Sequence, residues 1–261
     1  MQVTERREAV ELHGIRRTYR ILLLSDVHFS CFTTRRHNMA VTQAILHRLH
    51  GRIDGIFVTG DLISRKPGRT GVADALYLMQ QLRGYADVYY SLGNHETDLP
   101  AADKEAWLRS LRRIGVIVLD NSSCTMGDLR ITGLTLPGAV YRHRDGSFRD
   151  LMKITPRLVR RCAGSASAHP QILLAHNPLG LPAYAAWGAD LVLSGHVHGG
   201  VVRLPVIGGL LSPERRFFPR YTRGLYTLGG CRMEVSAGIG KFRFDNPPEI
   251  VYLKLYSTRK G

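Results

Sequence analysis

The chain has 261 residues, of which 44% are hydrophobic, and this is enough to bury the core of one large globular domain. Its 36 Lys and Arg residues outnumber 21 Asp and Glu, and the net charge of +15 favours anionic partners without choosing among nucleic acid, membrane and phosphorylated molecules. Residues 1–30 hold neither an export signal nor an apolar stretch long enough to cross a bilayer, so we expect a cytoplasmic protein. Four widely spaced cysteines without a CxxC pair predict free thiols: Cys31, Cys124, Cys162 and Cys231.

Strand and helix patterns alternate along the first part of the chain. Apolar, β-prone runs predict strands at 20–24, 55–59, 88–92, 172–175 and 191–195. Apolar residues at helical spacing predict helices at 37–50, 72–82, 101–114 and 148–162. This alternation indicates an α/β layered fold.

The second half of the chain changes character. Strand-like runs occupy 129–134, 201–205, 224–229, 231–238 and 249–257, and few helices separate the later ones. We therefore predict a second, partly antiparallel sheet packed face to face with the first, with helices outside both. Residues 1–261 are expected to form a single domain, in which 1–19 are an N-terminal extension or an edge strand.

Polar residues with metal-binding chemistry follow five of the predicted strands. They lie in the motifs SDVHFS, TGDLIS, LGNHE, LAHNP and SGHVHGG, and the residues concerned are Asp26, His28, Asp61, Asn94, His95, His176, His196 and His198. Because ligands bind beyond the carboxyl ends of strands in open α/β sheets, these residues are expected to converge. A single Asp-x-His is usually a buried histidine bonded to a turn aspartate, but five motifs with His, Asp or Asn at strand ends together predict a two-metal site.

The spacing of these motifs suggests how each residue would contribute. Side chains two apart on an extended segment point the same way, so the pair Asp26 and His28, and likewise His196 and His198, would each share a face. The two oxygens of the Asp61 carboxylate can bridge two cations. Nitrogen and oxygen donors without sulfur fit Mn, Fe or Zn.

The ordered set D-x-H, G-D, G-N-H-E, H and G-H-x-H resembles the calcineurin-like metallophosphoesterase superfamily over residues 20–256. The resemblance implies a four-layer α/β/β/α sandwich of two mixed sheets. It also implies two divalent cations, Mn first and Fe or Zn as alternatives, and hydrolysis by a metal-bridging hydroxide. The ligand sets it implies are Asp26, His28, Asp61 and His198 for one metal, and Asp61, Asn94, His176 and His196 for the other, with Asp61 as the bridge.

His95 is the member of the set that is not assigned to a metal, because its neighbour Asn94 is already a ligand and successive side chains diverge. We predict that it is the catalytic imidazole that faces the oxygen of the leaving group, with Glu96 as its orienting group. The alternative is a structural histidine behind the metal ligands.

A looser resemblance links the segments GGVVRLP, FFPRYTRGLY, VSAGIG and NPPEI to a bacterial branch of phosphodiesterases that includes UDP-diacylglucosamine pyrophosphohydrolase-type enzymes. Ala237 stands where that branch leads us to expect Arg, and Ser64 replaces an acidic residue. Neither change removes a predicted ligand. The resemblance favours a phosphodiester or pyrophosphate bond as the target.

Basic residues outside the motifs suggest contacts with anions. Arg203 is a candidate phosphate contact, because it follows the metal-binding loop closely. The Arg-rich segment 141–161 is either a solvated face or a surface for an anionic membrane, and 208–223 either packs into the body or contacts an acyl or aromatic group of the substrate.

The predicted function is therefore a dinuclear-metal phosphoesterase that acts on a phosphorylated small molecule or a lipid-linked substrate, with peripheral contact to an anionic membrane as a further expectation. Two alternatives stay open. The net charge of +15 favours a nuclease, although no aromatic-basic repeat supports nucleic acid as a partner. A non-catalytic scaffold on the same fold is the second, and the complete ligand set argues against it.

Overall fold

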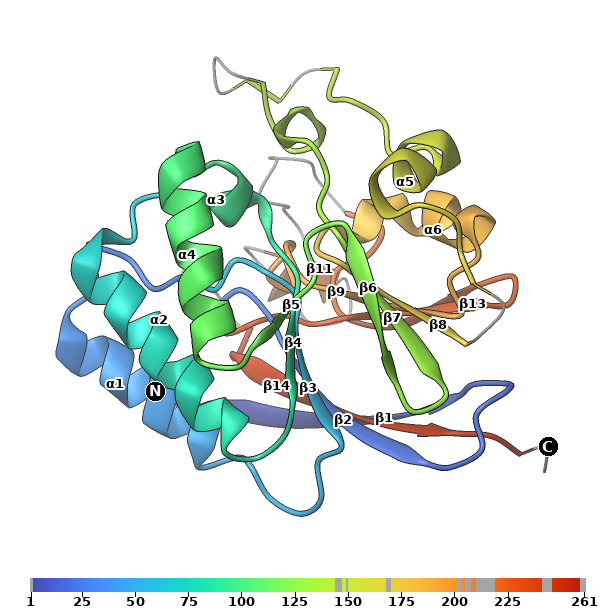
Figure 1. The fold of residues 1–261 in the computed structure, drawn as a ribbon, viewed down its shortest axis with the longest axis horizontal. Helices are drawn as coiled ribbons and strands as arrows, with labels where there is room; N and C mark the ends of the chain where they lie inside the picture. The colour runs from blue at the N-terminus through green and yellow to red at the C-terminus, as the bar shows by residue number, and fades with distance from the viewer. Residues whose placement is uncertain are drawn as a thin grey trace.

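Two six-stranded sheets lie face to face in the computed structural model, with helices covering both outer faces (Figure 1). The structure describes residues 2–143, 147–148, 150–167, 170–200, 203–204, 208–209, 219–240 and 246–258. Within these ranges, no helix is both long and apolar enough to cross a membrane.

The first sheet contains the strands that carry the first three motifs. Its order is β1 (Thr4–Glu11), β14 (Glu249–Tyr256), β2 (Tyr19–Leu24), β3 (Gly55–Val58), β4 (Val88–Tyr90) and β5 (Ile117–Val118). Strands β2 to β5 are parallel, while β14 pairs antiparallel to β2 and parallel to β1. The N-terminal residues thus supply an edge strand.

The second sheet carries the remaining motifs. Its order is β12 (Gly224–Leu228), β13 (Cys231–Val235), β9 (Leu191–Ser194), β8 (Gln171–Ala175), β7 (Leu129–Leu134) and β6 (Ser122–Met126). Its four central strands are parallel and its two edge strands antiparallel. A short antiparallel pair, β10 (Arg203–Leu204) and β11 (Gly208–Gly209), stands apart.

The helices form the two outer layers. The first sheet is covered by α1 (Arg35–Leu46), α2 (Gly68–Arg83) and α4 (Ala101–Arg113), and the second by α5 (Pro156–Ala163) and α6 (Leu181–Trp187). Short elements complete the chain: α3 (Asn94–Thr97) and the 3-10 turns η1 (Gly138–Val140) and η2 (Pro178–Gly180). The predicted four-layer α/β/β/α sandwich of two mixed sheets is confirmed.

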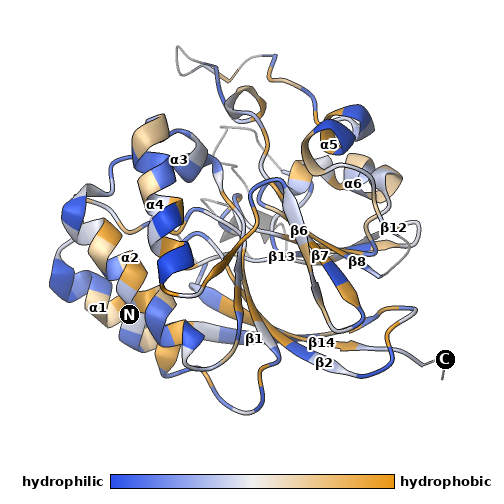
Figure 2. Ribbon diagram, viewed as in Figure 1, coloured by the Kyte–Doolittle hydropathy of each residue, from blue (hydrophilic) through white to orange (hydrophobic). Residues whose placement is uncertain are grey.

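Alternation along the buried strands explains the layers. Leu23, Phe57 and Leu193 point into the apolar core between the sheets, whereas their neighbours Leu22 and Val58 pack under the helices of the first sheet. Because successive side chains of a strand face opposite ways, a strand covered on both sides must be apolar throughout. Figure 2 shows the apolar colour continuing along the strands and on the inward sides of the helices.

Most predicted helices are found with shifted ends, and one is wrong over its first half. The helix predicted at 148–162 begins only at Pro156, because the Thr155 side chain accepts a hydrogen bond from Leu158 N and the Pro156 ring suits the first helical turn. Helix α6 and strand β6 were not predicted. Of the strand predicted at 201–205, the structure describes only Arg203–Leu204.

The direction of the parallel strands fixes where the motifs lie. Strands β2, β3 and β4 end shortly before Asp26, Asp61 and Asn94, and β8 and β9 end at or shortly before the remaining histidines. Parallel strands end at the same edge of their sheet, so the fold delivers polar residues from both sheets to one region.

Candidate metal centre

The predicted ligands from the five strand ends converge in the structure. Three groups of side chains have ligand atoms within 4.8 Å of one another, and each group could hold a metal ion. The groups are Asp26, His28 and His198; His28, Asp61 and His95; and Asp61, His176 and His196. Shared members join the three groups into one cluster.

Asp61 lies at the middle of this cluster. Its Oδ2 is 3.2 Å from His176 Nε2 and 3.8 Å from the Nε2 atoms of His28 and His95. Its Oδ1 accepts a hydrogen bond of 2.8 Å from the backbone N–H of His95. One oxygen is therefore fixed by the backbone while the other faces histidines on several sides, which is the geometry that a bridging carboxylate needs.

Asp26 is the second buried carboxylate of the cluster. Its Oδ1 is 3.7 Å from His28 Nε2 and 3.8 Å from the Nε2 atoms of His176 and His198. Its Oδ2 accepts a hydrogen bond of 2.9 Å from the backbone N–H of His196, which ties the loop after β2 to the loop after β9. The two sheets are joined at the site through this carboxylate.

Backbone strain is concentrated at the same residues. Among the described non-glycine residues, seven have a positive φ, and five of them are predicted ligands: Asp26, His28, Asp61, His196 and His198. Such conformations cost about 1–3 kcal/mol each and persist where the surrounding structure enforces them, typically at functional sites. We predicted that extended backbone places His28 on the same face as Asp26, and His198 on the same face as His196. The positive φ angles show that this geometry is wrong. Left-handed turns bring these side chains together instead.

Two buried polar atoms support a cation at this place. Asn94 Oδ1 is buried and has no hydrogen-bond partner among the described residues. His176 Nδ1 contacts the carbonyl oxygen of Thr59 at 2.6 Å, so a proton on Nδ1 is directed there, while the buried Nε2 faces Asp61 and has no hydrogen-bond partner among the described residues. Buried polar atoms normally find partners, and a divalent cation would supply one to both. The donor set therefore fits a nitrogen- and oxygen-ligated metal.

The electrostatics of the cluster also favour positive charge. Burial alone would raise the pKa of Asp26 and Asp61, but the surrounding histidines outweigh it and lower both. Burial alone would lower the pKa of His176, yet the two carboxylates raise it to about 10. The carboxylates thus attract positive charge, and divalent cations would take the place of protons on the histidines.

Glu96 supports the site through the backbone. Its fully buried carboxylate accepts hydrogen bonds from the N–H groups of Asp61 and Gly93, each 2.9 Å, and of Ile63 at 3.1 Å. A Cβ on Gly93 would lie 2.1 Å from Asp61 Oδ1, so only glycine permits this close approach of the two loops. Glu96 was predicted to orient His95, but the contacts in the structure show it holding the loop that carries Asp61.

His95 lies at the edge of the cluster with a defined tautomer. Its Nδ1 accepts a hydrogen bond of 3.2 Å from Arg65 N, so the neutral ring carries its proton on Nε2, which faces Asp61. Burial lowers the pKa of His95 to about 4. The ring can therefore present an N–H donor to a group bound at the centre.

A second set of supporting residues was missed by the sequence analysis. Asn246 Nδ2 donates to the carbonyl oxygens of His198 and, at 3.3 Å, Gly200. Glu249 Oε1 accepts a hydrogen bond of 2.9 Å from Ala237 N, in the loop whose Gly240 N–H bonds to Asp26 O. Asn246 and Glu249 belong to the motif NPPEI, which the sequence analysis used only for its resemblance. Their hydrogen bonds hold two loops of the site, one after His198 and one at Ala237.

Tyr141 is a further residue of the site that gave no sequence signal. Its buried ring lies 5.1 Å from the ring of His196, edge to face, and 6.3 Å from that of His176. It borders the side of the cluster on which these two histidines lie. The sequence placed it only at the start of a basic segment.

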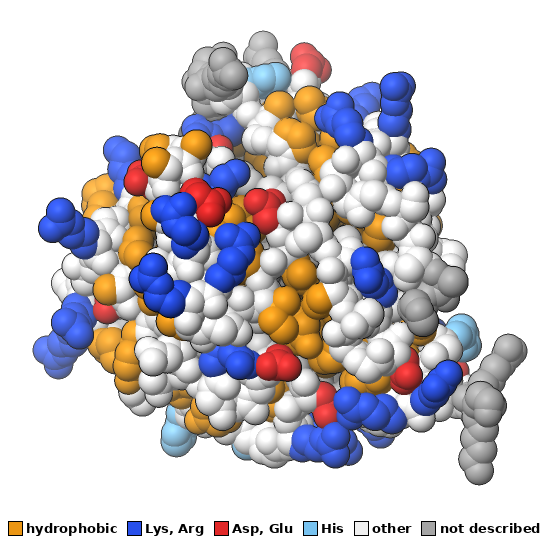
Figure 3. Space-filling model, viewed as in Figure 1, with side chains coloured by type: hydrophobic (Ala, Val, Ile, Leu, Met, Phe, Trp, Pro, Cys, Tyr) orange, Lys and Arg blue, Asp and Glu red, His pale blue; other side chains and the backbone are white. Residues whose placement is uncertain are grey.

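The other predicted contacts lie outside the cluster or outside the described side chains. Arg203 belongs to β10, but its side chain is not among those described, and most of 208–223 is likewise outside the described residues. Arg142 pairs with Asp98 at 3.1 Å, and α5 exposes Arg157, Arg160 and Arg161. Figure 3 shows Lys and Arg side chains spread over the visible face rather than gathered in one patch. Contact with an anionic membrane stays a prediction.

Comparison with known proteins assigns the class of protein that this fold and site define. The model of the calcineurin-like phosphoesterase family matches residues 19–200, and the chain belongs to this family. It is therefore a metal-dependent phosphoesterase, and the predicted superfamily is confirmed.

Individual relatives place the chain in a bacterial branch. It is 25% identical over 245 residues to phosphodiesterase YaeI of Escherichia coli, covering 91% of this chain and 82% of that protein. It is 28% identical over 254 residues to the uncharacterized metallophosphoesterase Cj0846 of Campylobacter jejuni, covering 94% and 61%. It is 26% identical over 208 residues to UDP-2,3-diacylglucosamine pyrophosphatase LpxG of Chlamydia trachomatis, covering 72% and 57%. The chain thus spans little more than half of some relatives.

The role of Glu96 yields a stability prediction. Replacing Glu96 by Gln should lower the free energy of unfolding by about 2 kcal/mol, because the amide has only one acceptor oxygen for three buried N–H donors. Urea unfolding of metal-free protein measures this. The control is Glu105→Gln on the surface of α4, where a loss below about 0.5 kcal/mol is expected. Equal effects of the two substitutions would contradict the role given to Glu96.

Proposed function

We propose that this phosphoesterase hydrolyses a phosphodiester or pyrophosphate bond with two divalent cations held by seven side chains. One cation would be bound by Asp26, His28, Asp61 and His198, and the other by Asp61, Asn94, His176 and His196. The observation that carries the proposal is the central position of Asp61 Oδ2, which faces ligands of both sets.

The cations would supply a water of lowered pKa as nucleophile and would neutralise charge on the phosphoryl group. The protein's part is positioning. Strained loops hold the donors in place before substrate arrives. The Nε2–H of His95 is directed toward the centre, where it can donate a hydrogen bond to the oxygen of the leaving group.

The choice of a diester or pyrophosphate bond rests on two relatives, one named a phosphodiesterase and the other a UDP-2,3-diacylglucosamine pyrophosphatase. The substrate we propose is a phosphorylated small molecule or a lipid-linked phosphate. Nitrogen and oxygen donors without sulfur fit manganese, iron and zinc alike, and manganese is proposed first because of the family resemblance alone.

Metal removal and a substrate panel test this function. Protein stripped with a chelator should lose at least about 100-fold in turnover of bis-p-nitrophenyl phosphate, and Mn²⁺ should restore it. The diester should be hydrolysed faster than p-nitrophenyl phosphate, and single-stranded DNA should be left intact. Activity that survives stripping would contradict metal dependence, a preference for the monoester would exclude a phosphodiesterase, and cleavage of DNA would favour the nuclease alternative.

Substitution of His95 tests its proposed role. His95→Ala should lose about 10²–10⁴-fold in rate with phenyl leaving groups and much less with p-nitrophenyl, because a good leaving group needs little help from a proton donor. The variant should keep its metal, and the matched control His47→Ala, an exposed histidine at the end of α1, should leave both rates unchanged. Loss of metal from His95→Ala would make this residue a ligand, and equal losses on both substrates would remove the role in leaving-group departure.

A further inference from the structure

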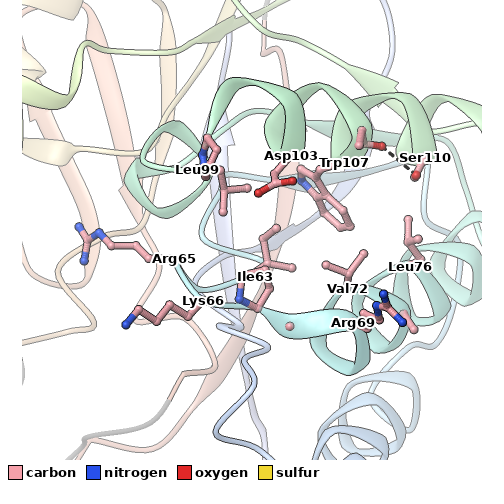
Figure 4. Close-up of a pocket in the computed structure, with 15 residues that line it drawn as sticks. Ile63, Arg65, Lys66, Arg69, Val72, Leu76, Leu99, Asp103, Trp107 and Ser110 are labelled. Carbon is pink, nitrogen blue, oxygen red and sulfur yellow. Dashed lines mark hydrogen bonds between the residues drawn. The ribbon is translucent and has the colours of Figure 1, made fainter.

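An apolar groove of about 700 Å³ lies between α2 and α4 (Figure 4). Its floor is formed by the buried side chains of Ile63, Leu99 and Trp107, and one wall by Val72 and Leu76, which lie one helical turn apart on α2. Its volume is within the range of small-molecule sites, which are mostly apolar with a few polar groups at defined positions.

The rim of the groove carries positive charge at both ends. Arg65, Lys66 and Arg69 are among the lining residues, the first two at one end of the groove and Arg69 beside Leu76 at the other, and among the described lining residues Asp103 is the only acid. Arg65 pairs with Asp98, but Lys66 and Arg69 are exposed and make no ion pair with a described acidic residue. An apolar cavity with unneutralised cations on its rim is complementary to an amphiphile that has an anionic head and an apolar arm.

The groove and the candidate metal centre are built from the same stretch of chain. Asp61 lies at the centre, Ile63 is in the floor of the groove, and Arg65 stands on its rim. Arg65 N also donates the hydrogen bond to His95 Nδ1. Four residues of chain span at most about 14 Å, so one molecule can reach both places.

We propose that this groove binds the alkyl or acyl arm of the substrate, while the phosphate to be cleaved lies at the metal centre. The proposal rests on the phosphodiesterase function proposed above, and it narrows the substrate to an anionic amphiphile. Lys66 and Arg69 attract the anionic part, and Val72, Leu76 and Trp107 remove the apolar part from water.

Binding of decyl phosphate to metal-free protein, measured by calorimetry below the concentration at which it forms micelles, tests the groove without any catalysis. Wild-type protein should bind it, and the double substitution Val72→Gln with Leu76→Gln should weaken binding at least about tenfold, since several buried methylenes lose apolar contacts. Glutamine keeps the length and helical propensity of α2. The matched control Leu225→Gln with Leu228→Gln changes two exposed leucines of β12 and should have no effect.

A second measurement changes the cations of the groove, Lys66 and Arg69, and leaves its apolar residues intact. Lys66→Gln with Arg69→Gln alters two exposed residues only, and it should weaken decyl phosphate binding severalfold at low salt and less at high salt. Absence of binding to wild-type protein, or equal binding by all variants, overturns the groove as a site for an amphiphile.

Kinetics decide whether the bound molecule is a substrate. With methyl, butyl and octyl p-nitrophenyl phosphate, kcat/KM of the Mn²⁺-loaded enzyme should rise about two- to fourfold per methylene. The Val72→Gln, Leu76→Gln enzyme should lose this rise, whereas the matched control Leu225→Gln with Leu228→Gln should keep it. If kcat/KM does not rise with alkyl length, or if the rise persists in the Val72→Gln, Leu76→Gln enzyme, the groove does not bind the substrate's alkyl arm. The proposed phosphodiesterase function would still stand. Failure to hydrolyse even the methyl ester refutes the proposed function. The calorimetric experiment with decyl phosphate then still decides whether the groove binds an amphiphile.

Discussion

The structure depends on two carboxylates, Asp26 and Asp61, that are buried where the ends of two sheets meet. A buried carboxylate is costly unless charge and hydrogen bonds compensate for the water it loses. Here backbone N–H groups of His95 and His196 fix one oxygen of each, and histidines from both sheets surround the others. Asn94 Oδ1, which has no hydrogen-bond partner among the described residues, marks a place where a cation would complete the compensation.

The fold supports this arrangement with hydrogen bonds that tie three loops of the site to neighbouring segments. Glu96 holds the loop of Asp61, Asn246 holds the loop of His198, and Glu249 holds the segment that bonds to Asp26. Left-handed backbone at five of the seven proposed ligands shows that these ties act against local preference. Under the proposed function, the packed sheets would thus hold the ligands in place before a metal binds. The loop that carries Asp61 continues along the chain into the groove beside α2.

The layered fold and the convergence of the proposed ligands could be predicted from the sequence, because both follow from short local patterns of residues. Apolar runs that end in Asp, Asn or His identify parallel strands and the edge where their ends meet, and this placed all seven proposed ligands together. Other features could not be predicted, because they depend on contacts distant in sequence. Asn246 and Glu249 act on loops before them in the chain, and Tyr141 reaches the histidines only once η1 is packed. Extended geometry was expected for Asp26 and His28, since nothing local reveals a left-handed turn.

The most direct test of the central claim is the number of Mn²⁺ ions that bind per chain, counted by elemental analysis after equilibrium dialysis of wild-type protein and of Asp61→Asn. If the Asp61 carboxylate bridges two cations, wild-type protein should bind about two, and the variant, which keeps the shape of the side chain but loses its charge, should bind about one or fewer. A single ion in the wild-type protein, or two ions that remain in Asp61→Asn, would contradict the account.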